Sequence, residues 1–422
     1  MQSVLDWLPE QLKWVVYLMV CRLLLKSQLD FEIIEPITKD THKTWIFCST
    51  IGEVNACKPL IDKLAAKSEL VFFTDRSTYT ESFQKLYPSA HVYSLEHGGN
   101  ILSLIAQYKP QHLVICEIPG LPNDAPCKLS YELLRRVKKF GAKLHLVNAW
   151  LYDYSPSCRQ DKLERMFFHR DYLTLFDSIT AQNKEVSARL SAAGGKNVIV
   201  AGNMKFDALS DTQINIKDPV SEQLLSHYSH SSEPLFIAGC VSGFWEYELV
   251  IPAMRWALDN GFSGHFVIAP RHPEKPEHLA KIASLLTDSV LSYNFKSKLK
   301  SGVGFTQNVL ILDTIGELRS YYSVADSAYI GLNHNVLEPL AFNLPLVVTK
   351  GWNTQFPSYP VYYETNQCGL LHEADSIEGV GKFILQHSQH NAANFSAVQQ
   401  LANMSGATGK CIESMSRVGM VF

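Results

Sequence analysis

Two polar segments in the last third of the chain have the residue types of a nucleotide-sugar site. The first, Thr314 to Glu317, separates a short apolar run from an amphipathic helical pattern. This pattern predicts a strand-to-helix turn whose backbone N–H groups can bind a phosphate. The second segment follows the next apolar run and contains Asn335 and Glu338. Because a carboxylate only accepts hydrogen bonds, Glu338 is suited to the paired hydroxyls of a ribose.

A third segment places Arg271 and His272 at the end of an apolar run and directly before a proline. Arginine presents a planar fork of donors that matches a phosphate, and histidine adds a further donor. The pair is therefore a candidate for binding a diphosphate or phosphoester. The same two residues are also common in an ordinary surface loop, so both interpretations stay open.

Acidic and basic residues that are candidates for activating or binding an acceptor lie in the first half of the chain. Glu53 follows an apolar run and is expected in the first turn of a helix. In a cleft between domains its pKa would rise, making it a usable general base, whereas a purely structural glutamate would only favour the helix start. Lys205 follows a glycine turn, while Arg159 and Lys162 belong to a basic region. For these three, acceptor binding competes with a structural turn or a solvated helix face.

Composition limits the protein class. The chain has 422 residues, 46% hydrophobic and 19% charged, which predicts two folded domains of similar size. A net charge of −3 gives no case for nucleic acid binding. A local excess of nine Lys and Arg over four Asp and Glu runs from Tyr131 to Arg170 and can face an anionic partner. The nine cysteines form no C-x-x-C or Cys/His pattern, which favours a reducing compartment and predicts no metal site.

The N-terminal segment is strongly apolar from Leu12 to Leu25 but is interrupted by Lys13 and Arg22. It is shorter than the roughly 20 apolar residues of a spanning helix and lacks a cleavage site for a signal peptide. Aromatic residues accompany it, as they do at membrane interfaces. It is expected to lie in the surface of a bilayer, with an ordinary buried first helix as the alternative.

The elements that must position these residues alternate between strands and helices. Strand-like apolar runs separated by helical patterns predict a parallel, doubly wound sheet in each half of the chain. We expect a membrane-associated helix at 1–30, a Rossmann-like acceptor-binding domain at 31–210, a linker region at 211–232 and a nucleotide-sugar-binding domain at 233–422. The predicted fold class is α/β, with two Rossmann-like domains facing across a cleft, the GT-B architecture that two-domain epimerases share.

Five ordered segments together resemble the motif series of the Kdo (3-deoxy-manno-octulosonic acid) transferases. In chain order they read WIFCSTIGEVNACKPLI, GNMKFD, APRHPE, DTIGELRSYYSVAD and HNVLEPLAF. The resemblance covers most of the chain from Trp45 to about Leu371. It implies an inverting, metal-independent and cofactor-free transfer of Kdo from CMP-Kdo to a lipid A precursor. It also implies attachment to the cytoplasmic face of the inner membrane of Gram-negative bacteria, for lipopolysaccharide biosynthesis.

Carried onto matching positions, the resemblance implies that Glu53 is the general base and that Glu338 holds the donor's ribose. It implies that the remaining loop residues bind the donor: Arg271, His272, Thr314, Ile315, Gly316, Glu317 and Asn335. It implies that basic side chains meet the phosphates of the acceptor: Arg159, Lys162 and Lys205.

The sequence departs from the family pattern at positions expected near the substrates. Only Leu332 and Asn333 separate Gly331 from His334, where the family has a longer glycine-rich loop, and Cys240-Val241-Ser242 replaces Ser-Thr-His. Two alternatives therefore stay open. The protein transfers another CMP-linked nonulosonic acid or uses another acceptor, or it is an inactive binding or regulatory relative.

Overall fold

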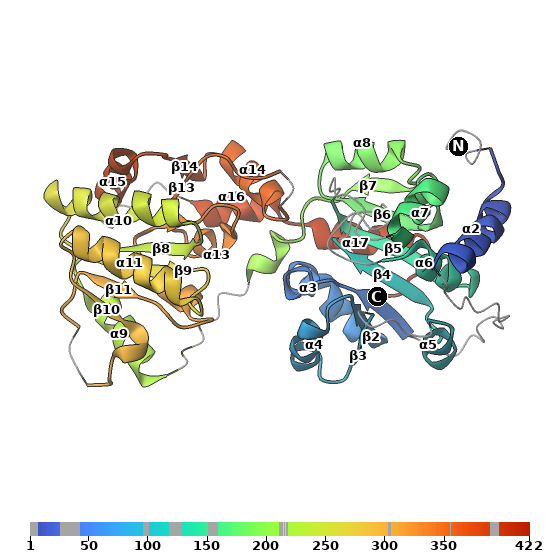
Figure 1. Ribbon diagram of the computed structural model, residues 1–422, viewed down its shortest axis with the longest axis horizontal. Helices are drawn as coiled ribbons and strands as arrows, with labels where there is room; N and C mark the ends of the chain where they lie inside the picture. The colour runs from blue at the N-terminus through green and yellow to red at the C-terminus, as the bar shows by residue number, and fades with distance from the viewer. Residues whose placement is uncertain are drawn as a thin grey trace. The chain divides into compact units, whose positions relative to one another are not determined.

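The computed structural model describes residues 7–25, 43–95, 101–117, 129–150, 159–210, 214, 216, 218–302, 305–354, 356–388 and 396–422. The chain forms two compact units (Figure 1). Unit 1 comprises Met1–Ala208 and Met404–Phe422, and unit 2 comprises Leu209–Asn403.

Unit 1 is built on a parallel seven-stranded sheet in the order β3-β2-β1-β4-β5-β6-β7. Its strands are β1 Lys43–Phe47, β2 Glu69–Thr74, β3 His91–Ser94, β4 His112–Cys116, β5 Lys143–Ala149, β6 Ser178–Ala181 and β7 Val198–Val200. The strand order reverses between β1 and β4. Open α/β sheets bind ligands beyond the carboxyl ends of the strands at such a reversal, so the segments after β1 and β4 occupy the expected place for a site.

Helices cover both faces of this sheet. Alternation along β1 sends Trp45 and Phe47 into one apolar core and Ile46 into the other. The first core includes residues of α2 Glu10–Leu25, α5 Ile101–Tyr108, α6 Tyr131–Lys139, α7 Arg159–Phe168 and α8 Lys184–Ala192. The second includes residues of α3 Ile51–Ala65, α4 Thr80–Leu86 and α17 Ala407–Ser416, and short 3-10 turns lie at Ser77–Tyr79, Leu173–Leu175 and Asp207–Ser210.

The N-terminal helix α2 packs one of its faces firmly on unit 1. Trp14 and Tyr17 are buried, and the Tyr17 hydroxyl donates to Glu164 at 3.0 Å. Lys13, which interrupts the apolar run in the sequence, turns inward and pairs with Asp171 at 2.6 Å. The charge that argued against a spanning helix therefore anchors α2 to the domain.

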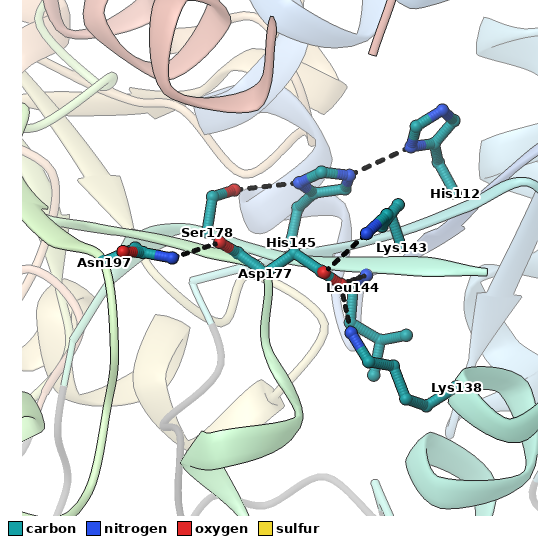
Figure 2. A network of polar contacts seen from close by, with 8 residues as sticks. All are labelled: His112, Lys138, Lys143, Leu144, His145, Asp177, Ser178 and Asn197. Atoms are coloured by element: carbon teal, nitrogen blue, oxygen red, sulfur yellow. Dashed lines mark hydrogen bonds and ion pairs between the residues drawn. The ribbon is translucent and has the colours of Figure 1, made fainter. Parts of the chain in front are cut away.

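The amino-terminal edge of the same sheet contains a polar network with a structural role (Figure 2). The ring nitrogens of His112 and His145 lie 3.0 Å apart, and His145 Nδ1 lies 2.8 Å from the Ser178 hydroxyl. Asp177 pairs with Lys138 at 2.5 Å and accepts the Leu144 N–H at 2.9 Å. These contacts tie together the starts of β4, β5 and β6, the edge opposite to the expected site.

The last helix belongs to unit 1 although the chain passes through unit 2 first. The Asp207 carboxylate accepts hydrogen bonds from the N–H groups of Gly406 at 2.6 Å and Thr408 at 2.5 Å, at the start of α17. The Thr180 hydroxyl lies 3.1 Å from Cys411 Sγ. The sequence assigned 233–422 to the second domain, whereas the structure groups 404–422 with the first.

Unit 2 contains a second parallel seven-stranded sheet, in the order β10-β11-β9-β8-β12-β13-β14. Its strands are β8 Leu235–Val241, β9 His265–Pro270, β10 Tyr293–Phe295, β11 Val309–Ile311, β12 Ser327–Ile330, β13 Leu346–Val348 and β14 Leu371–Glu373. Its helices are α9 Pro219–His230, α10 Phe244–Asp259, α11 Pro276–Asp288, α12 Leu318–Tyr322, α13 Leu337–Ala341, α14 Tyr359–Gln367, α15 Ile377–Gln386 and α16 Ala397–Met404, with a 3-10 turn at Lys296–Lys298. Here the order reverses between β8 and β12. The prediction of an α/β fold with two doubly wound sheets is confirmed.

Candidate functional site

Glu53 lies in the first turn of α3, directly after β1. Its Oε2 atom accepts hydrogen bonds from the backbone N–H of Ser49 and from that of Thr50, the latter at 3.2 Å. Within the described part of the chain no group donates to Oε1. The helix start therefore fixes the carboxyl through one oxygen and leaves the other for a substrate hydroxyl.

The pKa of Glu53 is raised to about 8, mainly by burial and also by the nearby carboxylates of Glu117 and Asp75, against the opposing effect of the N–H groups of Ser49 and Thr50. A carboxyl whose pKa is near the working pH accepts a proton from a hydroxyl more effectively than an ordinary glutamate. The two interpretations of Glu53 are thus compatible, because the residue accepts hydrogen bonds at its helix start and also has the raised pKa expected of a general base.

Glu117 follows β4, on the other side of the strand reversal from Glu53. Its side chain is buried, its Oε1 accepts from Asn148 Nδ2 at 2.7 Å, and Lys205 Nζ lies 3.1 Å away. Burial raises the pKa of Glu117, whereas Lys205 and Asn148 lower it. The Lys205 ammonium is therefore part of the network around the candidate base.

Asn148 organises the next part of this edge. Its Oδ1 accepts the Met204 N–H at 2.9 Å, and its Nδ2 also reaches Asn203 Oδ1 at 3.3 Å. Asn203 in turn donates to Gln182 Oε1 at 3.1 Å. Asn148 and Glu117 have φ angles of +52° and +58°, a backbone conformation that such residues rarely adopt and that concentrates at functional sites.

A second carboxylate, Asp75, follows β2 and completes the edge. The Ser49 hydroxyl donates to Asp75 Oδ1 at 2.6 Å, and both side chains are buried. Polar groups thus lie at or just after the carboxyl ends of six adjacent strands, which follow one another in the sheet as β2-β1-β4-β5-β6-β7. This density of buried polar side chains at one edge distinguishes a site from an ordinary apolar sheet end.

The three residues expected to bind acceptor phosphates have different surroundings. Lys205 pairs with Glu117, as described above, and Lys162 is exposed on α7. The side chain of Arg159 lies outside the described residues. Several other cations of the basic region are paired within unit 1, including Arg135 with Glu10 and Lys138 with Asp177. Much of the local charge excess is therefore neutralised by the protein itself.

In unit 2 the candidate donor residues follow the adjacent strands β11 and β9 and, on the other side of β8, the strand β12. Glu338 lies in α13, and burial raises its pKa, while the positive charges of Arg319 and Arg271 and a hydrogen bond with Asn335 lower it. The Asn335 Oδ1 also accepts the Leu337 N–H at 3.0 Å. The structure thus brings Glu338, Asn335 and Arg271 into one electrostatic neighbourhood, and adds Arg319 to it.

The turn from Thr314 to Glu317 is held by its own acidic residue. The Glu317 carboxylate is buried and accepts from the hydroxyls of Ser221, at 2.7 Å, and Thr314, while Lys296 Nζ lies 3.1 Å away. Gly316 has a φ of +80° and Ile315 is exposed. Glu317 therefore shapes the turn, and any donor contact here falls to the backbone.

His272 and His334 lie near Arg271. His272 Nδ1 is 3.0 Å from Glu274 Oε1. Burial and, to a smaller extent, the charge of Arg271 together lower the pKa of His334 to about 4. A neutral imidazole beside an arginine can donate or accept one hydrogen bond without adding charge.

The short connection after β12 is closed by a buried glutamate in α10. Glu246 Oε1 accepts from the Tyr329 hydroxyl and the Leu332 N–H, both at 2.8 Å, and its Oε2 accepts from the N–H groups of Ser242 and Gly243. One carboxylate thus joins the turns after β8 and β12 at the strand reversal. The short loop from Gly331 to His334 is a defined structure in which the His334 N–H donates to the Gly331 carbonyl at 3.2 Å.

Sequence reasoning did not single out several of these polar residues: Asp75, Glu117, Asn148, Gln182, Asn203, Glu246 and Arg319. A usable signal was present for some of them. Glu117 follows a buried apolar run directly and Asn148 stands near the end of another, positions at which parallel strands deliver side chains to a ligand site. Glu246 and Arg319 lie inside helical patterns and carried no such signal.

The protein contains two doubly wound sheets. One has a carboxyl group with a raised pKa at its strand reversal, and the other is followed by loops that contain basic and acidic residues. This combination defines the class of GT-B glycosyltransferases. A family model described as 3-Deoxy-D-manno-octulosonic-acid transferase (kdotransferase) matches residues 26–208. The 3-deoxy-D-manno-octulosonic acid transferase of Chlamydia muridarum is 27% identical over 72% of this chain and 69% of its own length.

A bifunctional glycosyltransferase/methyltransferase of Fusobacterium nucleatum is 26% identical over 74% of this chain, which spans about half, 48%, of that protein. Among solved structures, a putative UDP-N-acetylglucosamine 2-epimerase of Listeria monocytogenes has a TM-score of 0.59 at 14% identity, covering 89% of this chain and 96% of its own. That likeness shows the shared fold alone. The comparisons support the 3-deoxy-D-manno-octulosonic acid transferase family for this chain, through the match of residues 26–208 and the similarity to its curated members.

Proposed function

We propose that this protein transfers Kdo from CMP-Kdo to a lipid A precursor in lipopolysaccharide biosynthesis, with inversion at the anomeric carbon. The single observation that carries the proposal is Glu53, a partly buried carboxyl at the carboxyl end of β1 with one oxygen anchored and a pKa near 8. The similarity to the 3-deoxy-D-manno-octulosonic acid transferases suggests the donor and acceptor classes.

In the proposed reaction the Glu53 carboxylate takes the proton of an acceptor hydroxyl. The resulting oxygen nucleophile attacks the anomeric carbon of Kdo from the side opposite to the phosphate, a new C–O bond forms, and CMP leaves with the electron pair of the broken bond. Donor binding is assigned to Arg271, His272, Asn335, Glu338 and the Thr314–Glu317 turn. The guanidinium of Arg271 would stabilise the charge on the departing phosphate, and Glu338 would accept hydrogen bonds from the ribose.

Release of CMP by purified protein given CMP-Kdo and the lipid A precursor tests the proposal directly. We expect Glu53→Gln to lower kcat by about 10²–10⁴-fold, because the variant keeps the shape of the side chain but cannot accept the proton. The matched control is Glu81→Gln, an exposed glutamate on α4 whose pair with Lys85 lies on the surface. Turnover of Glu53→Gln at the wild-type rate would remove Glu53 from the mechanism.

A panel of CMP-linked nonulosonic acids separates the leading proposal from its nearest alternative. The departures from the family pattern at Cys240 to Ser242 and at Gly331 to His334 both lie at the strand reversal of unit 2. Release of CMP from a different nonulosonic acid, with none from CMP-Kdo, would replace the donor and keep the reaction class. Failure to bind CMP in calorimetry would favour a regulatory relative.

We also infer that α2 attaches the protein to the cytoplasmic face of the inner membrane. Opposite its buried face, α2 exposes an apolar stripe formed by Leu12, Val15, Met19 and Leu23, which are 44–80% exposed. Their spacing places them along one side of a helix. Among the helices that the structure describes, none has the length and apolar character needed to cross a bilayer. An apolar stripe with a firmly packed inner face supports binding in the plane of the membrane surface.

A further inference from the structure

A pocket of about 470 Å³ in unit 2 lies apart from the residues assigned to the donor. It is formed where β13 and β14 end and where α10 and α15 begin, and it is lined by Trp245, Thr349, Lys350, Asp375, Ser376 and Ile377, together with Glu248 and Leu249. The assigned donor residues follow β9, β11 and β12 instead. The pocket therefore extends the ligand-binding edge of the sheet toward β14.

Trp245 contributes an aromatic surface to this pocket. Trp245 is 48% exposed, although an indole buries a large apolar area when it packs in a core. The ring lies over Gly243, where an added Cβ would come within 2.7 Å of its Nε1 atom. Leu249 and the partly exposed Ile377 add aliphatic surface. The glycine thus permits an indole to face the pocket at the start of α10.

The charged groups that line the pocket are balanced. Lys350 Nζ lies 4.0 Å from Asp375 Oδ2, and the Lys350 N–H donates to Asp375 Oδ1 at 2.8 Å. Glu248, also at the rim, pairs with Lys281 at 2.6 Å. Among the described lining residues Lys350 is the only cation, and it already has a carboxylate beside it. A phosphate or carboxylate ligand would meet no uncompensated positive charge here.

We propose that this pocket binds an uncharged pyranose ring. The C–H face of a pyranose packs on the exposed indole of Trp245, and its hydroxyl groups donate to Asp375 and accept from Lys350. Such an aromatic wall with a few convergent polar groups is the usual construction of a small-ligand site. The inference goes beyond the proposed transfer reaction and does not require it, because binding of the sugar involves no donor nucleotide.

Saturation-transfer NMR and tryptophan fluorescence, with the methyl glycosides of glucose, galactose and N-acetylglucosamine as probes, test the proposal on the full-length protein. At least one glycoside should bind and change the fluorescence. Trp245→Ala should weaken that binding by about 3–10-fold, the size of a lost aromatic contact. Trp245→Phe should keep binding within about threefold while the fluorescence change disappears.

The matched control is Phe244→Ala. Phe244 is the neighbouring residue, is similarly exposed at 45%, and packs its ring against His278 rather than lining the pocket. We expect this variant to bind the glycoside as the wild type does, and saturating CMP to leave the binding unchanged. Absence of binding to all three glycosides, an undiminished fluorescence change in Trp245→Phe, or displacement of the sugar by CMP would each overturn the proposal. None of these results depends on whether CMP-Kdo is turned over.

Discussion

At the scale of single residues, the carboxylate of Glu117 influences the candidate base across the strand reversal of unit 1. After burial, it is the largest cause of the raised pKa of Glu53. Since a base works only when deprotonated, kcat/KM should rise with pH through an apparent pKa near 8. Glu117→Gln removes a negative charge near Glu53 and also removes the carboxylate that pairs with Lys205, and both changes favour the ionised form of Glu53.

The expected result for Glu117→Gln is a pH–rate profile displaced to lower pH by about half a unit to one unit. The profile of kcat/KM measured from pH 6 to 10 checks this, with Glu81→Gln as the control whose midpoint should match the wild type. A midpoint that stays in place would show that Glu117 has only a structural role. If Glu117→Gln loses activity but the midpoint of its pH–rate profile does not move, Glu117 likewise has only a structural role. This holds provided that the variant unfolds at the same urea concentration as the wild type.

The position of a candidate site residue could be predicted from the sequence where its place in a motif matched the chemistry of its side chain. Glu53 and Glu338 lie in the first turns of α3 and α13, the helices that follow strand-like runs, as their positions in the sequence indicated. The partners that set their pKa values could not be found in the same way. Glu117 acts on Glu53 across the adjacent strands β4 and β1, and Arg319 acts on Glu338 between the helices α12 and α13, so both effects depend on a tertiary arrangement that a single sequence does not specify.

At the scale of elements, the close approach of the β8 and β12 ends makes Gly331 a sensitive position. A Cβ there would lie 2.2 Å from the Cys240 carbonyl oxygen and 2.8 Å from its carbon, both backbone atoms. Gly331→Ala must therefore push the two strand ends apart. We expect it to lower the free energy of unfolding of unit 2 by about 2 kcal/mol and to weaken CMP binding.

Urea unfolding and CMP calorimetry measure the two effects. Gly409→Ala provides the control, because no atom lies within 4 Å of an added Cβ at this position in α17. In a helix interior that exchange should be neutral or stabilising by up to about 1 kcal/mol. Equal stabilities of the two variants would contradict a tight contact between Gly331 and Cys240.

A second prediction at this scale concerns the exposed stripe of α2. Replacing both Met19 and Leu23 by lysine places charges where apolar side chains are now 59% and 80% exposed. Because neither side chain belongs to the buried face, stability should change by less than about 0.5 kcal/mol. Binding to vesicles should fall by at least about tenfold, since two apolar contacts with the bilayer are lost.

Vesicle sedimentation with lipids of neutral charge measures this effect without electrostatic attraction. Leu86→Lys is the control, because Leu86 is 41% exposed on α4 in the same unit. Vesicle binding that is equal for the α2 variant and the wild type would show that the stripe is not the membrane surface.

Most elements followed from local patterns in the sequence. The long apolar runs predicted β1, β2, β4, β5, β8, β9 and β12, because a parallel sheet buries both faces of its strands. Two edge strands, β10 Tyr293–Phe295 and β14 Leu371–Glu373, were not predicted. Each has three residues and includes a polar one, so its strand state depends on the neighbour that pairs with it rather than on its own composition. The return of α17 to unit 1 likewise depends on a contact made by Asp207, about 200 residues earlier.

At the scale of the whole molecule, the two edges of the unit 1 sheet respond to pH in opposite directions. The raised pKa of Glu53 at the carboxyl edge means that acidification favours its folded environment. At the amino edge, burial lowers the pKa of His112 to about 4 and that of His145 to about 3. Asp177 opposes this shift for both rings, while Lys143 adds to it. As the pH falls, the carboxyl edge therefore gains stability through Glu53, whereas the amino edge loses stability through the two histidines.

The histidine network of Figure 2 gives a prediction for stability that can be separated from Glu53. Below pH 6.5 the unfolded chain binds protons on both histidines, whereas the folded chain excludes them until much lower pH. Stability contributed by each neutral ring is thus present above pH 6.5 and is lost as the pH falls, by at most about 1.4 kcal/mol per unit. Between pH 7 and pH 5 the loss from His145 alone should be about 2 kcal/mol.

His145→Gln isolates this contribution. At pH 7 the variant should be less stable than the wild type, because its side chain cannot reproduce the contacts with His112 and Ser178. At pH 5 the wild type has lost the contribution of His145, whereas the variant has no such group to lose, so the gap should narrow by about 2 kcal/mol. Glu53 titrates equally in both proteins and cancels in the difference. Urea unfolding of both at the two pH values measures the gap, and a constant gap would mean that His145 is protonated in the folded chain as readily as in the unfolded one.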